Sequence, residues 1–243
     1  MSVGDSEQGW AGYRRLIRIV PHQRHIDVDM EDDAHCFGVT IFHDGTTIDR
    51  VETREPRHPW TICPMAGAFL RERMQRLSLA KAPYVEDQRQ HCTHVYDLFV
   101  LGVRHVADDH PTIYAIRITD KDADGRKLAE IDRNGALLLT FADGQDLRAL
   151  AAWSATLPEE MQEAARMLRR GAMVGLSRGL TFSGGDTAAA LMDRMSGACF
   201  TFQPDRAAQA NRMPDSVRDF SNTPEKMLSG EQDDRRSGGL SRP

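Results

Sequence analysis

The sequence predicts an α+β fold, with a mostly antiparallel sheet and helices packed on one face. Short segments in which apolar and polar residues alternate are joined by turn-forming Asp-Gly and Asn-Gly pairs, which is typical of antiparallel hairpins. Longer segments carry apolar residues at helical spacing. The chain has 243 residues, 40% hydrophobic and 28% charged, which is enough apolar surface for a globular core.

The first half of the chain is expected to form two hairpins followed by two helices. Alternating apolar residues predict strands over 14–20, 25–30, 35–42 and 46–53. The sequence His43-Asp44-Gly45 between the last two strands is typical of a tight turn. Apolar residues at helical spacing predict helices over 65–77 and about 90–105.

The second half is expected to form a strand meander and then helices. Strands are predicted over 112–119, 127–133 and 136–141, and Asp124-Gly125 and Asn134-Gly135 are compatible with type I′ turns between them. Leu157-Pro158-Glu159-Glu160 places proline and acidic residues where a helix begins, and this helix is predicted to reach about Val174. A short helix is expected to end near Met195.

These elements divide the sequence into four parts. Residues 1–12 are expected to be a flexible leader and residues 229–243 a disordered tail, since the tail is mostly Ser, Gly, Asp and Arg. Residues 13–110 form a region rich in histidine and cysteine, and residues 111–228 contain the meander and its helices.

Composition excludes several classes of protein. The net charge of −5 gives no basic field for nucleic acid. No apolar run reaches the roughly 18 residues of a membrane span, and the polar start lacks a signal pattern. Four cysteines do not make a disulfide framework. We therefore expect a reduced, cytoplasmic protein that acts on a small molecule, without nucleic acid or membrane as partner; a homodimer is left open.

Histidine and cysteine are concentrated in one part of the chain. All nine histidines lie between His22 and His110, together with three of the four cysteines. Imidazole and thiolate suit zinc or iron. The predicted metal ligands are His35, Cys63, Cys92 and His94. Because Cys92 stands at a helix N-terminus, which lowers the pKa of a thiol, it is alternatively a nucleophile.

Carboxylates and further histidines near these ligands are candidates for catalysis. Asp97 lies three residues after His94 on the same helix face, so His94, Asp97 and His91 are the predicted catalytic residues. A carboxylate near His35 is also expected to orient an imidazole. Most of the acidic run over residues 29–33 is interpreted as a solvated loop.

Three arginines of the second half are candidates for binding an anion. Arg206, Arg212 and Arg218 follow one another at short spacing, and guanidinium groups bind carboxylate and phosphate bidentately. They are predicted to bind the substrate, and the alternative is a surface segment with its own ion pairs.

The stretch from Arg14 to about Val106 resembles a bacterial family described only as domain of unknown function 2889. The motifs that carry the resemblance are His35-Cys36-Phe37, the hairpin from His43 to Ile48, Ile62-Cys63-Pro64 and His91-Cys92-Thr93-His94-Val95. Two positions depart from the family pattern, since the family has Asp where this chain has Cys36 and Gly where it has His91. The resemblance implies no established activity, but it implies a context of aromatic or steroid-like catabolism.

The resulting hypothesis is a catabolic enzyme that carries out hydrolysis, hydration or carbon–carbon cleavage on an aromatic or steroid-like organic acid or its thioester. A metal bound by the predicted histidines and cysteines would assist the reaction. One alternative is a non-enzymatic metal or iron–sulfur carrier, since the hairpin and the two cysteines also resemble NifU-like scaffold proteins. A second alternative is a metal-free enzyme with a Cys-His nucleophile.

Overall fold

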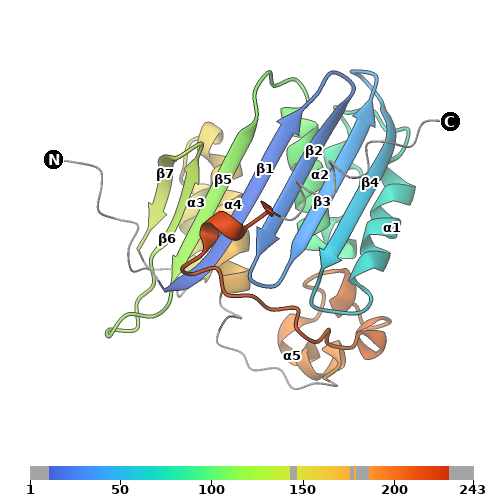
Figure 1. Cartoon of the computed structure of the whole chain (residues 1–243). Coiled ribbons are helices and arrows are strands. Elements are labelled where there is room, and N and C mark those ends of the chain that lie inside the picture. The colour runs from blue at the N-terminus through green and yellow to red at the C-terminus, as the bar shows by residue number, and fades with distance from the viewer. Residues whose placement is uncertain (1–10, 143–146, 176–177, 179–185, 230–243) are drawn as a thin grey trace. The chain divides into compact units, whose positions relative to one another are not determined.

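A computed structural model of the chain describes residues 11–142, 147–175, 178 and 186–229. Within them, seven strands form an antiparallel sheet in the order β4-β3-β2-β1-β5-β6-β7, and helices accompany it, which confirms the predicted α+β class (Figure 1). The strands are β1 (Gly12–Pro21), β2 (His25–Asp32), β3 (Cys36–His43), β4 (Ile48–Arg57), β5 (Thr112–Thr119), β6 (Ala129–Arg133) and β7 (Ala136–Phe141). The helices of four or more residues are α1 (Cys63–Met74), α2 (Thr93–His105), α3 (Leu147–Ala155), α4 (Gln162–Gly175) and α5 (Met192–Met195).

The chain divides into two compact units, and neither is a continuous half of the sequence. One unit, called the histidine unit here, comprises the described residues of Ile17–Thr112 and Thr181–Val217. The other, called the meander unit, comprises those of Met1–Leu16, Ile113–Leu180 and Arg218–Pro243. The first boundary falls close to the one expected after residue 110, but residues up to Val217 return to the histidine unit. All nine histidines and all four cysteines therefore lie in one unit.

Strands β2, β3 and β4 of the histidine unit have two different faces. Ile26 pairs with Ile41 and Val28 with Val39, so these side chains share one face because strand residues alternate. Helix α2 packs on that face, where a Cβ on Gly102 would approach Ile41 Cδ1 to 2.7 Å. A larger residue at this position would require the side chain of Ile41 to shift. The opposite face carries polar side chains from the same strands.

The described residues 186–217, which follow α4 in the chain, pack against the start of α1 in the histidine unit. Trp60 and Phe202 meet edge to face at a centroid distance of 5.7 Å. Around them lies a small apolar cluster: Trp60, Ile62, Cys63, Ala188, Phe202, Ala207 and Ala210. The backbone of Thr61 donates to the carbonyl oxygen of Asn211 at 3.0 Å. Residues far apart in the sequence thus share one core.

The meander unit contains β5, β6 and β7 with helices α3 and α4. Asn134 and Gly135 both have positive φ, 52° and 79°, which confirms the predicted type I′ turn between β6 and β7. Between β5 and β6 only Gly125 has positive φ, so Asp124-Gly125 belongs to a longer loop, and the predicted type I′ turn there is wrong. The segment that forms α3 was not predicted to be a helix.

The described residues bear on membrane spans but hardly on the two ends of the chain. No helix among the described residues is long and apolar enough to cross a membrane. The predicted leader and tail lie almost entirely outside the described part of the chain.

Candidate metal centre

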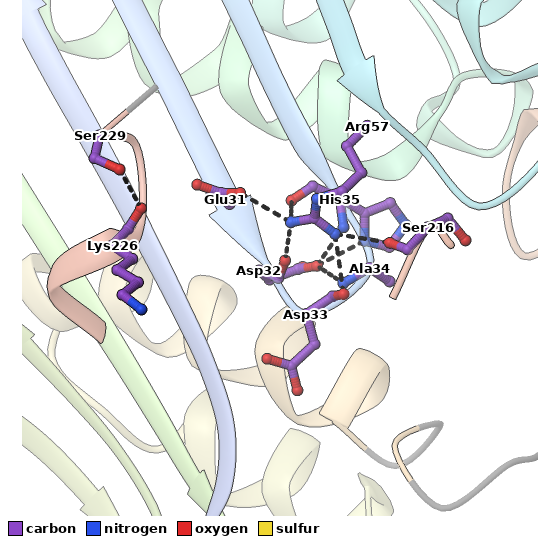
Figure 2. Close-up of polar contacts among 9 residues, drawn as sticks. All are labelled: Glu31, Asp32, Asp33, Ala34, His35, Arg57, Ser216, Lys226 and Ser229. Atoms are coloured by element: carbon purple, nitrogen blue, oxygen red, sulfur yellow. Dashed lines mark hydrogen bonds and ion pairs between the residues drawn. The ribbon is translucent and has the colours of Figure 1, made fainter. Parts of the chain in front are cut away.

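The connection between β2 and β3 is organised by one buried carboxylate. Asp32 Oδ1 accepts hydrogen bonds from the backbone N–H groups of Ala34 and His35, each at 2.8 Å, and contacts His35 Nδ1 at 2.9 Å (Figure 2). Asp32 is fully buried. The same oxygen therefore closes the turn and orients the imidazole, as expected for a carboxylate near His35.

A second histidine meets this pair from a different element. His94, in the first turn of α2, places its ring 4.0 Å from the ring of His35, with an interplanar angle of 30°. The buried ring of Phe37 contacts His35 and His94 edge to face, at 5.3 and 5.9 Å. One ligand atom from each of Asp32, His35 and His94 can be chosen so that all three lie within 4.8 Å of one another. This group is called the buried cluster below.

Arg57, at the end of β4, holds the backbone that carries the buried cluster. Its Nη2 donates to Glu31 Oε1 at 3.0 Å and to the carbonyl oxygens of Asp32 and His35 (Figure 2). Its Nη1 donates to the carbonyl oxygens of Asp33 at 3.0 Å and Ser216 at 2.8 Å. A buried guanidinium with one carboxylate and four carbonyl partners fixes the turn in one conformation.

The acidic run before His35 is buried, so its interpretation as a solvated loop is wrong. Asp29, Glu31, Asp32 and Asp33 are all at most 5% exposed. Asp29 pairs with Arg18 at 3.1 Å and with Arg54 at 2.8 Å, and Glu31 pairs with Arg57. Charges can be buried when cationic or N–H partners compensate them. Strand alternation turns Asp32 to the face that packs on α2 and Asp29 and Glu31 to the opposite face.

The predicted cysteine ligands lie in other surroundings. Among the described residues, the groups of three or more candidate ligands within 4.8 Å include His35 and His94 but neither Cys63 nor Cys92. Cys63 Sγ contacts Thr201 Oγ1 at 3.8 Å. The structure brings together two of the four predicted ligands and adds Asp32.

Burial controls the chemistry of these thiols. Burial raises the pKa of Cys63 to about 12, and the thiol of Cys199 adds to that effect. The pKa of Cys92 is raised well above its ordinary value, first by burial and then by the neighbouring thiols of Cys199 and Cys63. Burial therefore outweighs the lowering of the Cys92 pKa that was expected from its place at a helix N-terminus. A thiol that stays protonated is a poor nucleophile.

His91 and Asp97 make contacts of their own. The ring of His91 is fully buried between Phe69 and Tyr96, at centroid distances of 5.0 and 4.8 Å, and its Nε2 lies 3.5 Å from Glu86. Burial lowers its pKa, although Glu86 opposes the change. Asp97 accepts a hydrogen bond from Gln88 Nε2 at 2.6 Å. Of the three predicted catalytic residues, His94 alone is part of the buried cluster.

The three arginines predicted to bind substrate lie in different surroundings. Arg206 stacks over the ring of Phe200 at 3.9 Å and Arg212 over Trp60 at 5.4 Å, both in the histidine unit. Arg218 is exposed and belongs to the meander unit.

No family model matches the chain, and no curated protein matches it. The resemblance to domain of unknown function 2889 remains a prediction.

The donor set of the buried cluster indicates its chemistry. Two imidazoles and one carboxylate form a common ligand set for zinc in hydrolytic sites and for non-haem iron, and both kinds of site keep positions open. Arg57 was missed as a site residue in the sequence, and Asp32 was not chosen as a ligand because it lies in the acidic run interpreted as a solvated loop. The spacing of Asp32 three residues before His35 is a detectable signal, because aspartate commonly caps such a turn.

Proposed function

We propose that this protein is a metal-assisted enzyme whose zinc or iron ion is bound by His35, His94 and Asp32. The observation that carries the proposal is the contact of two imidazoles from different elements, 4.0 Å between ring centroids, beside a fully buried carboxylate. Two protonated imidazoles at this distance would repel each other, whereas a metal ion binds both in their neutral form.

Each residue of the buried cluster has a distinct role in this proposal. His35 and His94 supply nitrogen ligands. Asp32 completes the ligand set, or holds the proton on His35 Nδ1 so that Nε2 faces the metal. Arg57 is a positioning residue that keeps the turn rigid. The bound metal would supply a Lewis acid and an activated water.

The proposed reaction class and substrate follow from the resemblance to domain of unknown function 2889. Hydrolysis, hydration or carbon–carbon cleavage of an aromatic or steroid-like organic acid, or its thioester, is the chemistry we propose, following the resemblance described above. Arg206 and Arg212 lie in the same unit as the cluster and provide cations for the acid group. Arg218 belongs to the meander unit, and its role in binding the substrate stays a prediction.

Metal analysis of the purified protein tests the proposal. We expect about one zinc or iron per chain to survive dialysis. The bound metal should be lost in His35→Ala and in His94→Ala, and retained in the control His110→Ala, which replaces an exposed histidine. A panel of aromatic acyl thioesters and esters then gives the activity, which should disappear in the same variants. Retention of metal in both cluster variants, or no uptake by the wild-type protein after reconstitution, would reject the proposal.

A non-enzymatic metal carrier is the second candidate, supported by a different observation. The backbone N–H of Phe200 donates to the carbonyl oxygen of His91 at 2.9 Å, which brings Cys199 next to Cys92, and the thiol of Cys199 adds to the raised pKa of both Cys63 and Cys92. Loss of the bound metal in Cys63→Ser and Cys92→Ser, with retention in His35→Ala and His94→Ala, would favour the carrier. The raised thiol pKa values do not support the third alternative, a Cys92 nucleophile.

A further inference from the structure

A second histidine–carboxylate group lies at the opposite end of β2, where the chain turns from β1 into β2. His22 and His25 flank this turn, and the backbone N–H of His22 donates to the carbonyl oxygen of His25 at 2.9 Å. The two imidazoles are stacked at a centroid distance of 4.1 Å with an interplanar angle of 14°. Their side chains are 41% and 35% exposed, so solvent ions reach them directly.

Asp27 completes a set of three ligands. Its Oδ2 lies 3.5 Å from His22 Nε2 and 3.8 Å from His25 Nε2. Ligands on a tetrahedral ion with bonds near 2.05 Å are about 3.3 Å apart, by geometry from usual zinc distances. The observed separations exceed this by only a few tenths of an ångström. The three ligand atoms also meet the same 4.8 Å limit as those of the buried cluster.

The neighbouring strands hold these ligands in place. Thr40 on β3 donates its hydroxyl to Asp27 Oδ1 at 2.5 Å, and Arg54 on β4 donates to the same hydroxyl oxygen at 2.8 Å. With Oδ1 engaged in this way, Oδ2 is directed to the imidazoles. His25 in turn stacks on Phe42, its partner in the strand register, at 5.5 Å.

Alternation along β2 places this site apart from the buried cluster. His25 and Asp27 share one face of the strand, whereas Val28 faces α2, whose Gly102 lies against it. The new group therefore lies on the face of β2 opposite α2, and at the other end of the strand from Asp32.

We propose that His22, His25 and Asp27 form a surface site for a divalent transition-metal cation such as zinc, cobalt or nickel. Neutral imidazoles and one carboxylate are ligands that these cations prefer. Three protein ligands leave at least one position to solvent, which suits an exchangeable ion. This site does not depend on the proposed function, because it shares no residue with the buried cluster.

Zinc titration of the full chain carrying His35→Ala and His94→Ala tests the proposal. In that background the buried cluster lacks its histidines, so calorimetry with zinc chloride at pH 7.5 reports the surface site. We expect one binding event that weakens more than about tenfold on further replacement by His22→Ala, His25→Ala or Asp27→Asn. The control His110→Ala should leave the isotherm unchanged.

Two readouts keep the outcomes distinct. Because the side chains of His22 and His25 are partly exposed, these variants should keep the circular dichroism spectrum and melting temperature of their parent. If the double-variant background does not fold, the same titration is made on the wild-type chain with paramagnetic broadening by nickel, which assigns the histidines that bind. Equal binding with and without His22 and His25, or broadening centred elsewhere, overturns the proposal. Absence of metal from the buried cluster of the wild-type chain rejects only the proposed function.

Discussion

The two ends of β2 carry the same ligand chemistry in opposite surroundings. At one end the buried Asp32 and His35 and the half-buried His94 lie beside Phe37, and at the other the partly exposed rings of His22 and His25 meet the buried carboxylate of Asp27. Electrostatic interactions are stronger where water is excluded. The buried end is therefore suited to hold a metal tightly and assist a reaction, and the exposed end to exchange an ion.

The supporting residues differ in the same way. At the buried end the carboxylate Glu31 and four carbonyl groups converge on one guanidinium, Arg57. At the exposed end a single hydroxyl, that of Thr40, orients Asp27. Arg54 donates in turn to that hydroxyl, so an arginine supports each group, through the backbone at the buried end and through a hydroxyl at the exposed end.

The largest effect is expected from removing the guanidinium at the buried end. Arg57→Met leaves Glu31 buried without its partner, because the two side chains are only 9% and 5% exposed. The free energy of unfolding should fall by about 3–5 kcal/mol, the usual cost of breaking a buried pair. Urea denaturation measures it, with Arg50→Met as control, since Arg50 is 54% exposed and pairs with the exposed Glu52. A similar small loss for both variants would contradict the role given to Arg57.

A smaller effect is expected from removing the hydroxyl at the exposed end. Thr40→Val keeps the shape of the side chain but removes the hydrogen bond that orients Asp27. Zinc affinity of the surface site should fall about tenfold, or about 1.4 kcal/mol. The same calorimetric titration measures it, and Thr140→Val on β7 is the matched control. Unchanged affinity would show that Asp27 needs no orientation from β3.

The smallest effect is expected in the pH dependence of stability, through the buried His43 on β3 near the exposed end. Burial lowers the pKa of His43, with Asp49 opposing and His25 adding to the effect. Its Nδ1 accepts a hydrogen bond from the backbone of Gly45 at 3.2 Å, which requires a neutral acceptor. The imidazole of His43 therefore has a lower pKa in the folded chain than in the unfolded chain, where it is near 6.5. As pH falls below about 6.5 the unfolded chain takes up this proton first, so the folded state loses stability.

His43→Asn keeps an acceptor for Gly45 and removes this titration. Melting temperatures recorded in chelator between pH 7.5 and 5 should decrease less steeply for the variant than for the wild-type protein. Equal slopes would assign the acid sensitivity to other groups.

Local signals in the sequence predicted much of the fold. The Asn134-Gly135 turn and the strands that alternate in polarity need only neighbouring residues to form, so they were visible. The helix α3 was missed, because its sequence LRALAAWSA is rich in small residues that mark no polar face.

The candidate site was predicted only in part. His35 and His94 were selected for their chemistry, and they do meet. The burial of Asp32, and of the acidic residues before it, depends on partners such as Arg54 and Arg57, which lie more than twenty residues away. The grouping of Cys199 with Cys63 and Cys92 likewise depends on the return of the chain to the histidine unit.

The order of segments along the chain has a consequence for synthesis on the ribosome. The histidine unit begins at Ile17 but is completed only when Thr181–Val217 has been made, after most of the meander unit has been translated. At about 5–20 residues per second, the 68 residues from Ile113 to Leu180 between the two segments take on the order of ten seconds. During that interval Trp60, Ile62 and Cys63 lack the residues that cover them, including Phe202 and Ala207. A nascent chain therefore exposes an apolar patch, and we expect a chaperone to bind this patch until the chain is complete.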